Sequence, residues 1–193
     1  MRKTLFFPLL LLVVSLSIFS CEKAEQTLSY PAATGYEGGG TMSGRIDDPD
    51  SSACPPTAVT LVAGQTINSG QVIVSNDANF IYVTYEMANG YTLAQTHLYV
   101  GDCSAIPVNN PGNPMPGQFP YKGVHNNITT YTYQVPISVM NGATCGCVAA
   151  HAVVQKLNAS GQVVDQQTGW GNGVRINLSG GNWGMKFDYC VCQ

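Results

Sequence analysis

The chain of 193 residues carries 8 Lys and Arg against 11 Asp and Glu, a formal net charge of −3. Only 10% of the residues are charged, whereas 45% are hydrophobic and Gly, Thr, Asn and Tyr are frequent. This composition is typical of a compact secreted domain rich in β-structure. Because no cluster of Lys and Arg is present to neutralise phosphates, we expect no nucleic-acid partner.

A signal peptide is predicted over residues 1–20. The basic Met1-Arg2-Lys3 precedes an apolar run, Leu5 to Phe19, that is shorter than the roughly 20 apolar residues of a spanning helix. Ile18-Phe19-Ser20-Cys21 resembles the bacterial lipobox, in which the cysteine carries the lipid. The sequence therefore predicts a lipoprotein acylated on Cys21. The alternative is an ordinary secretory signal followed by an incidental cysteine.

A diacylglyceryl cysteine would hold the protein on a membrane stably. Each buried methylene contributes about 0.8 kcal/mol, and two acyl chains, such as palmitate, are needed because one anchors only reversibly. Glu22-Lys23-Ala24-Glu25 follows the cysteine and is similar to the export signal of Bacteroidetes surface lipoproteins. We therefore expect a lipid-anchored protein of the outer membrane, in either its periplasmic or its cell-surface leaflet.

Residues 21–40 form a predicted flexible tether, rich in Ser, Thr, Ala, Pro and Gly and ending in Gly38-Gly39-Gly40. A single domain is then expected over residues 41–193. Near its start, Asp47-Asp48-Pro49-Asp50 is the only acidic cluster. It lacks the ligand order of an EF-hand loop, so a solvated turn is favoured over a Ca²⁺ site.

Short strands follow one another through the predicted domain. Residues 79–87 and 91–100 are rich in β-branched and aromatic side chains, and Asn89-Gly90 between them predicts a hairpin. The segment Pro107–Pro120 carries five prolines and is excluded from a central strand. Further strands are predicted over 57–62, 71–75, 131–139, 147–157, 162–168 and 182–192, with a turn at 158–161. Many short strands and no helical periodicity predict an antiparallel β-sandwich.

Six of the seven cysteines follow Cys21, an even number that favours disulfides in an oxidising compartment. If Cys145-Gly146-Cys147 and Cys190-Val191-Cys192 lie on facing antiparallel strands, partner residues have a constant sum of residue numbers. Cys145–Cys192 and Cys147–Cys190 satisfy one such register, which leaves Cys54–Cys103. The alternative, a four-cysteine zinc site, is disfavoured because zinc ligands are usually spaced on turns.

Several motifs occur in an order that resembles uncharacterised secreted β proteins of Bacteroidetes. They are Thr96-His97-Leu98-Tyr99-Val100-Gly101, Gly117-Gln118-Phe119-Pro120-Tyr121, Ala149-Ala150-His151-Ala152-Val153-Val154, Trp170-Gly171-Asn172-Gly173 and Gly181-Asn182-Trp183-Gly184-Met185-Lys186-Phe187. They cover roughly residues 72–189, most of the predicted mature chain. The resemblance implies an exported β fold; the family has no established activity, so no catalytic residue is implied.

No catalytic motif stands out in the sequence. His97, His125 and His151 would have to converge to form a catalytic zinc site, and their spacing is not that of a known ligand pair. Satisfied structural histidines are therefore the favoured interpretation. No Gly-x-Ser-x-Gly element, paired carboxylates or phosphate-binding loop is present, so we expect neither an enzyme nor a cofactor.

Aromatic residues interleaved with Asn and Gly are the remaining candidates for ligand contact. Trp170, Tyr91 and Tyr121, with Tyr36, are candidates for a platform on which sugar rings stack. Trp170, between two glycines, is the best candidate for exposure, whereas Trp183 alternates with apolar residues and is expected in the core. The opposing interpretation is that all of them fill the core or turns.

The function favoured by the sequence is a non-enzymatic, outer-membrane-anchored lipoprotein. It would act as a binding or accessory subunit of a cell-envelope or surface complex, with an outer-membrane protein as its partner. A surface glycan-binding module is the alternative, and a metal-dependent hydrolase that uses the histidines is the second alternative.

Overall fold

The computed structural model describes residues 55–192, which form an antiparallel all-β fold and confirm the predicted class. The strands are β1 (Thr57–Ala63), β2 (Ile67–Asn76), β3 (Phe80–Met87), β4 (Tyr91–Gly101), β5 (Tyr121–Ile128), β6 (Thr130–Pro136), β7 (Cys145–Leu157), β8 (Val163–Gly171), β9 (Val174–Arg175) and β10 (Met185–Cys190). Three short 3-10 helices accompany them: η1 (Cys103–Ala105), η2 (Pro116–Gln118) and η3 (Ile137–Met140). Across these described residues, no helix has the length and apolar character needed to cross a membrane.

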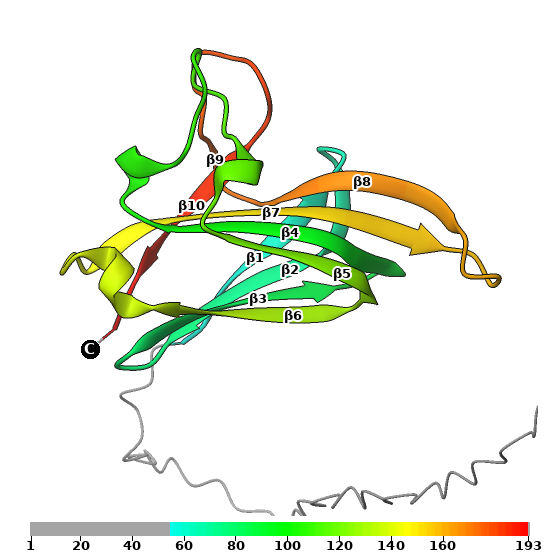
Figure 1. Cartoon of the computed structure of the whole chain (residues 1–193), viewed down its shortest axis with the longest axis horizontal. Helices are drawn as coiled ribbons and strands as arrows, with labels where there is room; N and C mark the ends of the chain where they lie inside the picture. Colours follow the sequence, from blue (N-terminus) through cyan, green and yellow to red (C-terminus); the bar gives the residue numbers. More distant parts are fainter. Residues whose placement is uncertain (1–54, 193) are drawn as a thin grey trace, which may run out of the picture. The chain divides into compact units, whose positions relative to one another are not determined.

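The strands form one sheet that curls into two layers. Its hydrogen-bonded order is β5-β4-β7-β8-β1-β2-β3-β6, with β10 added beside β7 and β9 beside β10. The first four strands make one layer and the last four the other (Figure 1). The layers are continuous where Leu61–Ala63 pairs with Gly169–Gly171. The two ends of the path, β5 and β6, are separated in the chain by Thr129 alone, so the sheet is nearly closed.

The two strands of the predicted hairpin exist, but they do not pair with each other. β3 pairs with β2 and β6, whereas β4 pairs with β5 and β7. Asn89 and Gly90 do adopt the expected positive φ, 56° and 76°, and the turn closes through Tyr91 N–H and the Ala88 carbonyl. Both edges of each strand are already occupied, so the turn crosses from one layer to the other. The hairpin prediction is wrong, and its turn conformation is confirmed.

Alternate residues of both layers fill the space between them. The fully buried side chains include Leu61, Val72, Val74, Ile81, Val83, Tyr85, Leu93, Leu98, Val135, Val148 and Val154. Burying each such aliphatic side chain contributes about 1.5–3 kcal/mol. A second, smaller cluster lies on the outer face of the β4–β7–β8 layer and contains Tyr99, Ile106, Phe119, Cys147, Ala149 and Trp170.

The disulfides differ from the predicted pairing. Cys145 faces Cys190 in the β7–β10 pair and is bonded to it, while Cys147 faces Asp188 and is bonded to Cys103. The predicted Cys145–Cys192, Cys147–Cys190 and Cys54–Cys103 bridges are therefore wrong. The real register is shifted by two residues, which leaves Cys192 beyond the end of β10. Cys192 is also disulfide-bonded, and Cys54 lies outside the described residues.

Candidate functional site

Trp170 is buried, not exposed as predicted. It lies on the outer face of β8, with 4% of its surface accessible. The Phe119 ring packs 6.2 Å from it and the His151 ring 4.9 Å from it, measured between ring centroids. The tertiary fold brings Phe119 and His151 to Trp170. The flanking glycines therefore wrongly indicated that Trp170 is exposed. Trp170 is a packing residue of the outer cluster.

Tyr91 and Tyr121 do not share a surface with Trp170. Both pack in the cluster between the layers, whereas Trp170 belongs to the outer cluster. The Tyr91 hydroxyl donates a 2.6 Å hydrogen bond to Asp165, which raises the pKa of Tyr91 and lowers that of Asp165. These three side chains therefore form no common sugar-binding platform. Tyr36 lies outside the described residues.

Two of the three histidines meet, and the third lies elsewhere. His97 on β4 is directly opposite His151 on β7, and their Nδ1 atoms are 3.2 Å apart. His125 Nε2 instead lies 2.7 Å from the Thr96 hydroxyl, which points to the interior face of β4. Because Thr96 and His97 are adjacent on a strand, their side chains point to opposite faces. A three-histidine metal site is therefore not formed.

His125 belongs to a side-chain cluster that closes the gap between β5 and β6. The Thr96 hydroxyl is 2.7 Å from both His125 Nε2 and the Tyr133 hydroxyl. The Tyr131 ring packs 4.4 Å from the imidazole, and Gly123 leaves the space that the imidazole occupies. Burial lowers the pKa of His125, which favours its neutral form. Sequence analysis missed this cluster, because β5 itself carries few β-branched residues.

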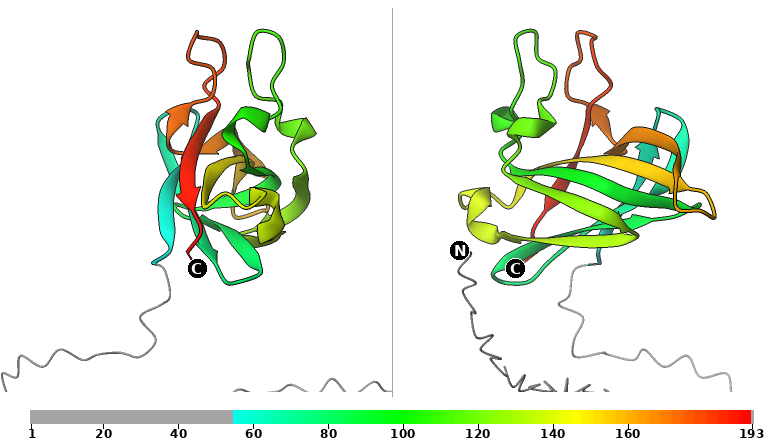
Figure 2. Two further views of the ribbon diagram at one scale, coloured as in Figure 1. Left: turned by 90° about the vertical axis from the view of Figure 1, so that its left-hand side faces the viewer. Right: turned by 45° about the vertical axis from the view of Figure 1, so that its right-hand side comes forward.

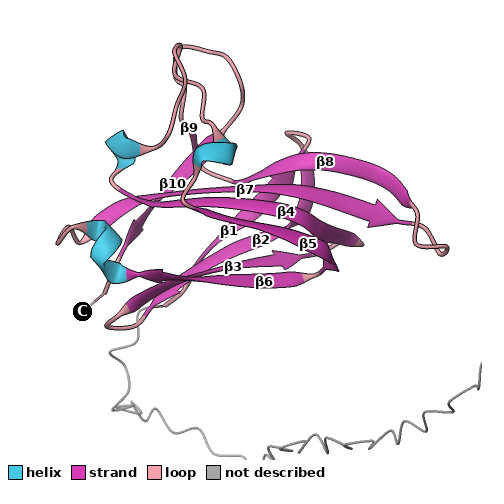
Figure 3. Ribbon diagram, viewed as in Figure 1, coloured by secondary structure: helices cyan, strands magenta, loops and turns pink. Residues whose placement is uncertain are grey.

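Two long loops project together from one side of the domain (Figures 1 and 3). We define the loop pair as residues 102–120, between β4 and β5, and residues 172–184, between β8 and β10. The Asn177 side-chain amide donates to the Pro111 carbonyl (3.1 Å) and to Asn113 Oδ1 (3.0 Å). Asn182 N–H donates to the same Asn113 oxygen at 3.0 Å. These bonds fix the two loops to each other.

The base of the loop pair is held to the sheet. The Cys103–Cys147 disulfide attaches the first loop to β7, and fully buried Phe119 packs against Trp170. Asp102 Oδ1 accepts bonds from the Ser104 backbone N–H and hydroxyl, which lowers the pKa of Asp102. The loop pair is therefore a constrained surface on a rigid scaffold.

A cleft of about 400 Å³ opens between the two loops. Its walls combine apolar side chains with hydroxyl and amide groups, and are formed by Cys103, Ser104, Ile106, Val108, Pro111, Gly112, Ile176, Asn177, Leu178 and Ser179. Leu178 is 86% exposed beside it. Asp102 and Arg175 are the only charged residues of the loop pair. Recognition here would depend on shape, apolar contact and hydrogen bonds.

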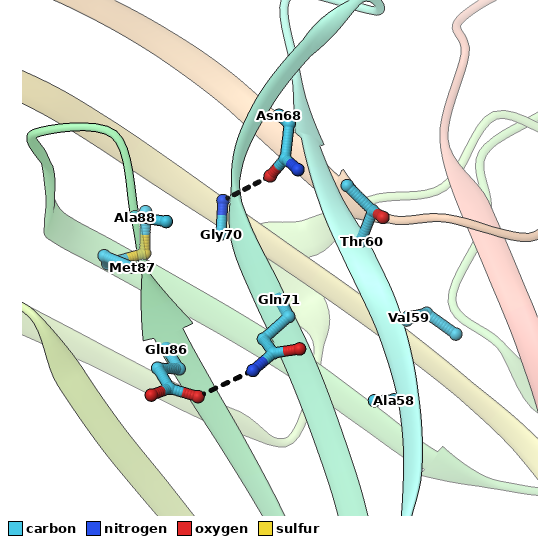
Figure 4. Close-up of a pocket in the computed structure, with 9 residues that line it drawn as sticks. All are labelled: Ala58, Val59, Thr60, Asn68, Gly70, Gln71, Glu86, Met87 and Ala88. Atoms are coloured by element: carbon cyan, nitrogen blue, oxygen red, sulfur yellow. Dashed lines mark hydrogen bonds between the residues drawn. The ribbon is translucent and has the colours of Figure 1, made fainter.

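A second depression, of about 340 Å³, lies over β1, β2 and β3 (Figure 4). Glu86 and Gln71 point toward each other within it, and the Gln71 amide donates a 2.8 Å hydrogen bond to the Glu86 carboxylate. Both polar groups are thus already partnered. None of the residues proposed from the sequence as ligand contacts lies here, so the loop pair is the stronger candidate.

One group of potential metal ligands occurs in the described part of the chain: Cys103, Cys147 and Asp188. Both cysteines are bonded to each other in a disulfide, which removes their thiolates from metal binding. No family model, curated protein or solved structure matches this chain.

Proposed function

We propose that this protein is an outer-membrane-anchored lipoprotein whose loop pair binds a partner in a cell-envelope or surface complex. The observation that carries the proposal is the position and rigidity of the loop pair. Its loops are tied to each other by Asn113 and Asn177 and to the sheet by the Cys103–Cys147 disulfide. Binding residues are commonly placed on such loops, held by a rigid scaffold.

The loop pair lies far from the start of the described chain. Thr57, at the start of β1, pairs with Val74 of β2. The side chain of nearby Asn76 is hydrogen-bonded to the backbone of Cys192. This end of the domain lies opposite the loop pair in every view (Figures 1 and 2). The described chain therefore enters β1 at the end of the domain opposite the loop pair.

The chemistry of the loop pair suits a protein surface. Exposed Leu178 and the apolar wall of the cleft supply contact area, while Asn and Ser groups supply hydrogen bonds. The loops lose little conformational entropy on binding because they are already constrained. The same mixture of groups also suits a glycan, which remains the alternative ligand. In that case the cleft, and not Trp170, would be its site.

The proposal is tested by purifying the protein from detergent-solubilised envelopes after mild crosslinking. We expect recovery of one membrane protein in stoichiometric amount from wild type. The Cys21→Ser protein should no longer be found in the membrane fraction, and the partner should no longer co-purify with it. Recovery of the lipoprotein alone, together with specific retention on a glycan array, would favour the alternative.

A further inference from the structure

We propose that His97 and His151 form a two-histidine Zn²⁺ site on the outer face of the β4–β7 pair. The β4–β7 register places the two residues directly opposite each other, and their Nδ1 atoms face across 3.2 Å. His151 is 8% exposed, whereas His97 is half-buried, so an ion would approach from the His97 side. This site is separate from the loop-pair cleft and does not depend on it.

The separation of the two nitrogens suits a tetrahedral ion. With Zn–N bonds of about 2.0–2.1 Å, two ligands of a tetrahedron are about 3.3 Å apart. Adjacent ligands in a square plane are closer, about 2.8 Å for similar bond lengths. The observed 3.2 Å, which is also the length of the hydrogen bond between the two rings, is close to the separation expected for tetrahedral zinc. No third His, Cys, Asp or Glu of the described residues completes the set, which leaves the other positions to water or an external ligand.

The protonation state of the pair also suits a metal. An imidazole with an ordinary pKa of about 6.5 is mostly neutral at pH 7, and the neutral form is the one that binds metals. Without an ion, one Nδ1 carries a proton and donates a hydrogen bond to the other Nδ1. Zinc would take the place of that proton, which would move to Nε2 of the same ring.

The surroundings hold the two rings in place. The Trp170 and His151 rings pack edge-to-face, with an angle of 62° between their planes. Lys122 lies opposite His97 on β5, and its ammonium donates to the Gly117 carbonyl at 2.9 Å. This positive charge near His97 opposes cation binding. Lys122→Met should therefore strengthen zinc binding, an effect that a purely structural histidine pair would not produce.

The test is a calorimetric titration of the purified mature protein with ZnCl₂ at pH 7. We expect one ion per chain, with His97→Gln weakening the affinity about tenfold or more. His125→Gln is the matched control, because it removes the third histidine on the other face, and should leave the affinity unchanged. Thermal melting without zinc checks that each variant is folded.

Three results would overturn the proposal. They are the absence of stoichiometric zinc binding to wild type, equal affinity of His97→Gln and wild type, or an equal loss in His125→Gln. If His151→Gln fails to fold, His97→Gln still decides the outcome, because His97 is half-buried and its loss disturbs packing less.

Discussion

Cys103 and Cys147 are joined just beyond the end of β4, with Cα atoms 4.9 Å apart, and this bond fixes the first loop to the beginning of β7. Replacing both with Ser should lower the free energy of unfolding by about 2–4 kcal/mol, because the unfolded chain gains entropy. The loop 102–120 should also become the first site of limited proteolysis. Denaturant unfolding and peptide mapping measure both effects, and an unchanged cleavage pattern would show that the loop needs no disulfide to stay ordered.

Trp170→Ala should destabilise the whole protein. Its indole is 4% exposed and contacts Phe119 and His151, so truncation leaves a cavity that costs about 3–5 kcal/mol. Trp183→Ala, which removes a partly buried indole, should cost less. Urea unfolding of the two variants makes the comparison. A wild-type stability for Trp170→Ala would mean that the outer cluster is not packed as described.

Stability should fall in mild acid because of His151. Its folded-state pKa of about 3 lies below the ordinary 6.5, so the unfolded chain binds more protons between these values. The free energy of unfolding should therefore drop as pH falls from 6.5 toward 3, by about 1.4 kcal/mol per pH unit at most for this group. His97 and His125 act in the same direction. His151→Asn should flatten this slope, and an unchanged slope would assign the acid sensitivity to other groups.

The stability of the side-chain cluster between β5 and β6 should depend on the Thr96 hydroxyl. Thr96→Val removes its contacts with both His125 and Tyr133, and we expect a loss of about 1–3 kcal/mol because the buried Tyr133 hydroxyl and the part-buried His125 imidazole each lose a partner. Tyr133→Phe removes only one of these contacts and should cost about 1 kcal/mol. Tyr131→Phe is the control, since the Tyr131 ring packs on His125. Equal stability of all three variants would contradict this arrangement.

The sequence predicted strands and turns correctly where the alternation of apolar and polar residues agreed with the turn residues. The turn at 158–161 joins β7 and β8 as predicted, with hydrogen bonds between Asn158 and both Gly161 and Gln162. The equally strong Asn89-Gly90 signal misled, because strand pairing is decided by which edges remain free. The strand β5 escaped detection, since Gly123, Asn126 and Asn127 weaken its propensity.

Side-chain positions that depend on register could not be read from local sequence. The β7–β10 register differs from the predicted one by two residues, so Cys145 faces Cys190 instead of Cys192, and Cys147 faces Asp188 instead of Cys190. Trp170 was misplaced for a related reason, because Phe119 reaches it from a loop some 50 residues earlier in the chain. The meeting of His97 with His151, 54 residues apart, is fixed by the β4–β7 register alone.

The most direct test of the proposed function compares two matched surface substitutions. Leu178 in the loop pair and Val124 on β5 are 86% and 85% exposed, so Arg at either position should be tolerated by the fold. Both variants are purified from detergent-solubilised envelopes after crosslinking, beside wild type. We predict that Leu178→Arg loses the co-purified partner while Val124→Arg retains it. Equal recovery of the partner by both variants would contradict a binding role for the loop pair.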